Sequence, residues 1–277
     1  MREEATAFVP GHITGFFSAH PDEDLTKAGS RGAGLTLTDG VEVTVTPAAS
    51  DESTIFLDGE ELEIDPVSTV LETLSVTARV EAESELPLGA GFGISGAMAL
   101  GTALAANRVF ACKLSTNELI TIAHGAEVQA GTGLGDVVAQ AHGGVPIRLE
   151  PGGPQVNVLD AIPARARVEY VSFGQLSTAG VLSDDTDQLT AAGKEALARV
   201  VDEPTLLSFM YASRRFARDA ELLTEQVREA IADVSAVEGQ ASMAMLGETV
   251  FALGTGLSDA GYEPSVCATH PAGAMLR

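Results

Sequence analysis

The sequence has 277 residues, of which 39 are Asp or Glu and only 16 are Lys or Arg, so its formal net charge is −23. A surface this acidic repels nucleic acid and anionic membranes, and we expect neither as a partner. Because 45% of the residues are hydrophobic and no apolar run reaches about 18 residues, the composition predicts a globular protein with a substantial core and no transmembrane helix.

The acidic residues are spread along the chain rather than gathered in a tail, and we interpret this as adaptation to a very salty cytoplasm. At about 1 M salt the Debye length falls to about 3 Å, so a dense negative surface then destabilises the fold much less. Cys112 and Cys267 have no metal-ligand spacing, and the first residues lack a basic region followed by an apolar core. We therefore expect a cytoplasmic, halophilic protein with reduced thiols.

The first 85 or so residues have the pattern of strands and turns. Apolar and polar residues alternate around Asp39–Gly40 and again around Asp58–Gly59, and each pattern predicts a β-hairpin. Residues 66–74 are expected to form a short helix, and residues 75–84 a strand that leads into a glycine-rich loop.

Helices dominate the remainder of the chain. A capping box at Ser115–Glu118 predicts one helix start, and Gly143–Gly144 predicts the end of another. The expected helices span residues 97–110, 116 onward, 136–142, 187–201 and 204–234, and the expected strands span 145–150, 166–173 and 248–254. The segment 151–154, PGGP, is the best linker candidate, which divides the chain into lobes 1–150 and 151–277. Hairpins followed by helices favour an α+β fold over a doubly wound parallel sheet.

The loop in LPLGAGFGISGAMAL (residues 86–100) matches G-x-G-x-x-G at Gly91, Gly93 and Gly96. A dinucleotide site is disfavoured because the preceding strand alternates polar residues and no acidic residue ends a second strand about 20 residues on. No lysine is present for a Walker-type loop. The loop is better suited to a phosphate chain, which glycine backbone and a helix N-terminus near Ser95 can hold. A plain tight turn with Ser95 as the N-cap is the competing interpretation.

Two carboxylates flank a second glycine-rich segment. Glu127 lies near the end of an apolar helix, and Asp136 opens the next helix after the turn at residues 131–135. Such a pair can converge, with one carboxylate on Mg²⁺ and the other on a substrate hydroxyl. Taken singly, each acid is more simply a solvated helix end or an N-cap, so the prediction rests on their occurrence together with the Ser95 loop.

Three motifs resemble those of the GHMP kinase superfamily. LPLGAGFGISGA resembles its nucleotide-binding motif, and PGHITGFF (residues 10–17) resembles its first, substrate-side motif. GLGDVVAQAHGG resembles the segment in which a catalytic Asp precedes a Gly–Gly pair by seven residues. Phe92 and Ile94 depart from the common pattern, and SMAMLGETVFALG (residues 242–254) replaces the usual C-terminal glycine motif. These departures, with GSRGAGL at residues 29–35, resemble the archaeal pantoate kinase branch, whose members phosphorylate pantoate in coenzyme A biosynthesis.

The resemblance implies a two-lobed GHMP-kinase-like fold and phosphorylation of a small alcohol with ATP and Mg²⁺. Asp136 would act at the attacking hydroxyl as base or electrostatic guide, and Ser95 and Glu127 would hold Mg²⁺. Nucleotide contacts are expected from Pro87, Gly89, Gly91, Gly93, Ser95, Gly96 and Ala97. The superfamily also suggests a homodimer, although no feature of the sequence requires one.

Pantoate carries a carboxylate, which needs a fixed donor in a chain that is poor in cations. His12, Arg31 and Arg148 are the candidates, and we favour His12 and Arg148 because they flank assigned motifs. Thr14 and Ser18 are candidates for hydroxyl contacts. The alternatives that stay open are another small-alcohol kinase acting on homoserine, shikimate or mevalonate, a nicotinamide-dependent oxidoreductase, and a non-catalytic nucleotide-binding module.

Overall fold

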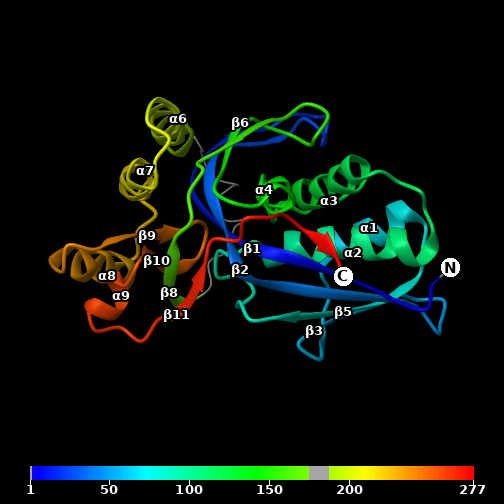
Figure 1. Ribbon diagram of the computed structural model, residues 1–277. Helices are drawn as coiled ribbons and strands as arrows, with labels where there is room; N and C mark the ends of the chain where they lie inside the picture. The colour runs from blue at the N-terminus through cyan, green and yellow to red at the C-terminus, as the bar shows by residue number, and fades with distance from the viewer. Residues whose placement is uncertain (1, 175–186) are drawn as a thin grey trace.

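The computed structural model describes residues 2–174 and 187–277, and it contains two β-sheets with helices packed against them (Figure 1). The strands are β1 Ala5–His20, β2 Gly29–Pro47, β3 Thr54–Leu57, β4 Glu60–Glu61, β5 Ala78–Ser84, β6 Pro146–Glu150, β7 Val158–Ala161, β8 Arg167–Gly174, β9 Gln240–Ala244, β10 Glu248–Leu253, β11 Ser265–Ala268 and β12 Met275–Leu276. The first sheet has the order β12-β1-β2-β5-β3-β4, with β6 paired to β2 and β7 to β6. The second sheet has the order β11-β8-β10-β9.

The helices fall into two groups, one for each lobe (Figure 1). They are α1 Asp65–Leu74, α2 Ile94–Phe110, α3 Thr116–Ala130, α4 Asp136–His142, α6 Asp187–Asp202, α7 Leu206–Asp219, α8 Glu225–Ala236 and α9 Gly256–Asp259. α2 and α4 pack on the first sheet and α1 and α3 pack against α2; α6 contacts β1 and β2, α7 contacts β1 and β9, and α8 and α9 pack on the second sheet. The predicted α+β class is confirmed. β5, which leads into the glycine-rich loop, pairs antiparallel with β2 and parallel with the short β3, so it lies in a mixed sheet and not in the parallel sheet of a dinucleotide-binding fold.

β1 and β2 form the longest pairing in the molecule and connect the two lobes. The first half of β1 packs near α2, and its second half packs near α6 and α7. A Cβ at Gly15 would lie 2.7 Å from the Phe209 ring of α7, and one at Gly193 of α6 would collide with the carbonyl oxygen of Phe17. These two glycines therefore allow both helices to approach the strand closely enough to bury it.

The predicted hairpin at Asp39–Gly40 is wrong, because β2 runs through both residues as one strand with Gly40 opposite Pro10. The reason lies in the phase of the alternation. A two-residue turn would place Leu37 opposite Glu42, which mixes apolar and polar residues on one face. In the structure the strand continues through an irregularity at residues 37–39, where the register shifts between Pro10–Gly40 and His12–Thr36, and the side chains at positions 41, 43 and 45 beyond it are buried on one face.

Most of the other predicted elements are confirmed. The Asp58–Gly59 turn joins β3 to β4 with positive φ at both residues, as a type I′ hairpin requires. The capping box at Ser115 and Glu118 begins α3. The single helical pattern predicted for residues 204–234 is divided into α7 and α8, with Thr224 as the N-cap of the second helix. No helix within the described ranges is long and apolar enough to cross a bilayer.

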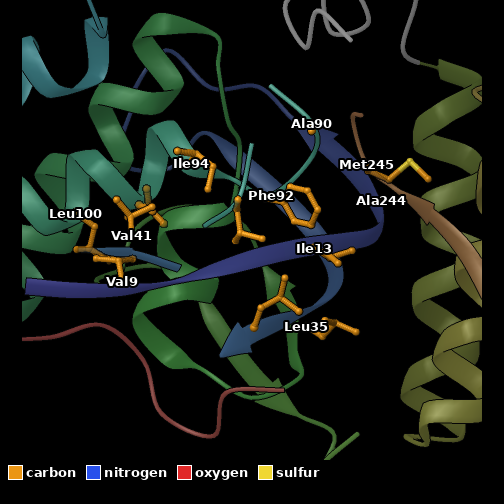
Figure 2. Close-up of a cluster of buried hydrophobic side chains, with 14 of the residues drawn as sticks. Val9, Ile13, Leu35, Val41, Ala90, Phe92, Ile94, Leu100, Ala244 and Met245 are labelled. Carbon is orange, nitrogen blue, oxygen red and sulfur yellow. The ribbon is translucent and has the colours of Figure 1, made fainter. Parts of the chain in front are cut away.

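One hydrophobic core extends across both lobes. It contains side chains from β1, β2, α2 and the glycine-rich loop as well as from α7, β9 and β10. Figure 2 shows part of it, where Ala90 and Phe92 of the loop gather with Ile13 of β1, Leu35 of β2 and Met245 after β9. This packing holds the loop at a fixed position between the lobes.

Candidate active site

A cavity of about 480 Å³ opens where the glycine-rich loop, β1, the start of α4 and the turn after β9 meet. Its wall includes Thr14, Phe17, Ser30, Ile64, Asp65, Leu88, Gly89, Gly91, Gly93, Ser95, Thr132, Gly133, Leu134, Asp136, Arg148, Met245 and Leu246. Arg148 is the single basic residue of this lining within the described part of the chain. The predicted catalytic, metal and nucleotide segments are therefore brought together around one space.

The glycine-rich loop presents the N-terminus of α2 to the cavity. Gly93 is the N-cap residue, with φ of 64°, and a Cβ there would lie 3.1 Å from the Cβ of Asp136. Only glycine combines this backbone conformation with so close an approach. The N-cap interpretation of Ser95 is wrong, because Ser95 lies inside the first turn of α2. Its hydroxyl is thus free for other partners, beside the unpaired N–H groups at the start of a 17-residue helix.

The second lobe holds the outer side of this loop. The Thr249 hydroxyl donates to the carbonyl oxygen of Ala90 at 2.7 Å, and Gly247 packs against the same backbone. The N–H of Met245 donates to the carbonyl oxygen of Thr14 at 3.0 Å, which places Met245 and Leu246 in the cavity wall. The divergent C-terminal motif therefore reaches the site, a role that its sequence did not reveal.

Glu127 and Ser95 meet behind the loop. Glu127 is 2% exposed, and its carboxylate accepts hydrogen bonds from Ser95 and, at 2.9 Å, from the Thr132 hydroxyl. Burial is the main cause that raises the pKa of Glu127 from 4.5 to about 7; the Ser95 hydrogen bond opposes this rise, and the nearby charge of Asp136 adds to it. The buried Glu127 carboxylate and the Ser95 hydroxyl are oxygen ligands of the kind that Mg²⁺ takes together with phosphate oxygens.

In metal-free buffer, Glu127→Gln is expected to raise the stability of the protein at pH 8 but not at pH 5. The folded state holds the Glu127 proton more tightly than the unfolded chain, so the free energy of unfolding falls as the pH rises from 4.5 through about 7. The rise in pKa corresponds to on the order of 3 kcal/mol. Thermal unfolding of both proteins at both pH values measures this difference, and an equal difference at pH 5 and pH 8 would contradict it.

Gly133→Ala is expected to weaken Mg²⁺ binding. A Cβ at this position would collide with Oε2 of Glu127 and lie 3.4 Å from Oδ2 of Asp136. The Mg²⁺ concentration for half-maximal activity should rise by about 10- to 100-fold. Gly125→Ala on the same helix as Glu127 is the control, since its Cβ would meet only the Cβ of Leu25 at 4.0 Å. Equal Mg²⁺ dependence of the two variants would exclude the proposed metal position.

Asp136 lies at the first position of α4 and faces the cavity. Its Oδ1 accepts a hydrogen bond from Nδ1 of His12 at 2.6 Å and one from the Thr14 hydroxyl at 3.4 Å. Burial alone raises the pKa of Asp136, but its interactions with His12, Arg148 and Thr14 outweigh this effect. The pKa of Asp136 is consequently held below its usual value, and the carboxylate is ionised at neutral pH.

Arg148 lies on β6 beside Asp136 and is 2% exposed. Its Nε and Nη1 have no hydrogen-bond partner among the described residues. A buried guanidinium with unpaired donors in a cavity wall is suited to a ligand carboxylate. Ser30, which the sequence analysis passed over, lines the same wall and donates to the carbonyl oxygen of Leu134 at 3.2 Å.

Several predicted residues lie outside the cavity wall. Arg31 follows Ser30 on β2, so it points to the opposite face, where its guanidinium pairs with Glu150 at 2.5 Å. Ser18 is buried and hydrogen-bonded to His20 at 3.0 Å. The remaining predicted residues outside the lining are His12, which is buried behind Asp136, Glu127, which is buried behind the loop, Pro87, which is exposed, and Gly96 and Ala97 of α2.

The fold and this site match a known class of enzymes. The model of the family described as "GHMP kinases N terminal domain" matches residues 65–144, which contain the glycine-rich loop, Glu127 and Asp136. A solved structure described as "Phosphotransferase related to CoA biosynthesis pathway" is 30% identical, with a TM-score of 0.87, and the match covers 99% of this chain and 98% of that one. The class that the fold and site define is the small-molecule kinase of the GHMP type.

Curated relatives narrow this class. A pantoate kinase of Methanospirillum hungatei is 37% identical over 262 residues, which are 90% of this chain and 87% of the relative. A pantoate kinase of Thermococcus kodakarensis is 34% identical over 89% of this chain and 86% of the relative. The chain belongs to the pantoate kinase family of the GHMP kinases.

Proposed function

We propose that this protein transfers the γ-phosphoryl group of ATP to the terminal hydroxyl of pantoate, forming 4-phosphopantoate for coenzyme A biosynthesis. The family supports this substrate. The structural observation that carries the proposal is the buried Arg148 guanidinium next to Asp136 in the wall of one cavity, below the start of α2. One group suits a carboxylate, the second an attacking hydroxyl and the third a phosphate chain.

Asp136 orients the attacking hydroxyl. Phosphoryl transfer has a loose transition state in which positioning and charge neutralisation matter more than early proton removal. The lowered pKa of Asp136 makes it a weak base, which agrees with this role. Its ionised carboxylate accepts the hydrogen bond of the hydroxyl, directs the oxygen toward the γ-phosphate and receives the proton as the new P–O bond forms.

Ser95 and Glu127 would hold Mg²⁺, and the backbone of residues 89–96 would surround the phosphates. The carboxylate of Glu127 supports this assignment, since it is buried, pairs with no basic side chain among the described residues and would gain a counter-charge from the metal. The metal would supply charge neutralisation of the phosphates during transfer. The unpaired N–H groups of α2 add positive potential, which compensates for the absence of a lysine from the described lining.

The direct test is ADP release measured with each alcohol in turn. We expect turnover with pantoate and much slower turnover with homoserine, shikimate or mevalonate. A preference for one of the other alcohols would keep the kinase class and overturn the substrate. ATP binding without ADP release for any of them would overturn the enzyme function.

We also propose that the protein acts in a reducing, salt-rich cytoplasm. Two free cysteines support the reducing compartment. The relatives from M. hungatei and T. kodakarensis lend no support to salt adaptation, which rests on the net charge of −23. Raising KCl from 0.1 to 2 M is expected to increase Tm and kcat, because screening weakens repulsion between surface carboxylates. Full stability and activity at low salt would contradict the adaptation.

A further inference from the structure

His12 lies behind Asp136 and cannot touch a ligand in the cavity. Its side chain has no exposed surface, and it is absent from the lining. Its Nδ1 lies 2.6 Å from Oδ1 of Asp136, which is the shortest contact of that carboxylate. The ring is thus placed to act on Asp136 and not on the acceptor carboxylate for which the sequence analysis considered it.

The surroundings of the ring select one protonation state. Nε2 has no hydrogen-bond partner among the described residues and packs against Gly34 of β2. Burial lowers the pKa of His12 more than Asp136 raises it, so the ring is neutral at neutral pH. The single proton of a neutral imidazole belongs on the nitrogen that has an acceptor, which is Nδ1. His12 is therefore a donor to an ionised Asp136.

The hydrogen bond from His12 makes the two carboxylate oxygens of Asp136 inequivalent. Oδ1 is taken by His12 and Thr14, whereas Oδ2 accepts no hydrogen bond from the described residues. Without His12, an Asp in the first turn of a helix can turn back to the free N–H groups of its own helix. The imidazole prevents this rotation and leaves Oδ2 for an incoming hydroxyl.

We propose that His12 is a positioning residue that fixes the rotamer of Asp136 through Nδ1–H, so that Oδ2 meets the acceptor hydroxyl. The inference rests on the proposed function, since it concerns the same phosphoryl transfer. It predicts that the loss of His12 lowers kcat and hardly changes KM, because no ligand touches the ring.

Two conservative variants separate this role from packing. In His12→Asn the amide nitrogen takes the position of Nδ1 and keeps a donor for Asp136, whereas in His12→Gln the amide lies nearer the position of Nε2, against Gly34. We expect His12→Asn to stay within about tenfold of the native kcat and His12→Gln to lose about 10²-fold, the cost of a small misplacement. Both should keep similar Tm and KM values. His142→Asn, at the exposed end of α4, is the control.

Equal kcat values for the Asn and Gln variants, or losses that follow Tm, would overturn the proposal. A double variant supplies a second criterion: His12→Gln should cause no further loss in an Asp136→Asn background, because both changes remove the same interaction. Independent full-sized losses would count against it.

A readout without turnover separates this inference from the proposed function. In ¹⁵N-histidine NMR spectra at neutral pH, His12 should show a protonated Nδ1 and an unprotonated Nε2, with the signal assigned by its loss in His12→Asn. An Nε2–H tautomer or an imidazolium would overturn the inference. If the native protein failed to turn over pantoate, only the substrate assignment would fail, and the NMR result would still decide the contact between His12 and Asp136.

Discussion

Replacing Asp136 with asparagine is expected to lower kcat with pantoate by about 10²- to 10⁴-fold while leaving the affinity for Mg-ATP nearly unchanged. The amide keeps the size of the side chain but loses the charge and the acceptor strength that the attacking hydroxyl needs. The phosphates are expected to contact the start of α2, and Ser95 and Glu127 are expected to hold Mg²⁺; the substitution leaves all of these groups in place. Coupled ADP release measures kcat, and calorimetric titration measures ATP binding.

The control for this experiment is Asp160→Asn, an exposed position on β7. It removes the same charge from a chain that is already strongly acidic, so any general electrostatic effect appears in both variants. An Asp136→Asn protein with near-native turnover would show that position 136 does not act on the hydroxyl. A large loss of ATP affinity would mean that the side chain contacts the nucleotide instead.

Arg148→Met is expected to reduce kcat/KM for pantoate by roughly 30- to 5,000-fold, which corresponds to a loss of about 2 to 5 kcal/mol in transition-state binding. The guanidinium is buried with two unpaired nitrogen atoms, so the substrate carboxylate is its natural partner. Methionine has a similar shape and no charge, which limits the damage to packing. Kinetics with pantoate and with 2,2-dimethylpropane-1,3-diol, which lacks the carboxylate, should show that the native preference for pantoate is lost in the variant.

Arg31→Met tests the competing candidate in the same assay. Arg31 is paired with Glu150 on the opposite side of β2, so we expect a much smaller effect on pantoate than for Arg148→Met. If the loss were larger at Arg31, the carboxylate would bind on that side of the sheet and the cavity assignment would need revision. If both variants kept the native preference, neither arginine would be the carboxylate donor.

Local signals predicted much of this fold because short-range physics decides them. The capping box at Ser115 and the Asp58–Gly59 turn each carry their own geometry, and both are confirmed. The Asp39–Gly40 turn failed because the same dipeptide also fits a continuous strand when a long partner is available. That partner, β1, shows no alternation of buried and exposed residues, because helices from both lobes bury it along its middle.

Part of the candidate site could be predicted from the sequence because its residues also lie in local patterns. Gly93, Ser95, Glu127 and Asp136 lie in contiguous motifs, and the structure brings them together. Ser30 and Met245 could not be found in this way, because their place in the wall depends on which face of β2 turns inward and on how the second lobe docks. A pattern within one segment contains neither kind of information.

β1 is covered by α2 at one end and by α6 and α7 at the other. Neither lobe therefore has a complete hydrophobic core of its own. Removal of the second half would expose the apolar flank of the central strand together with the outer side of the glycine-rich loop. We therefore expect heat or denaturant to melt the molecule in a single concerted transition. Access to the cavity must then come from local movement of chain segments, with the two lobes staying joined throughout turnover.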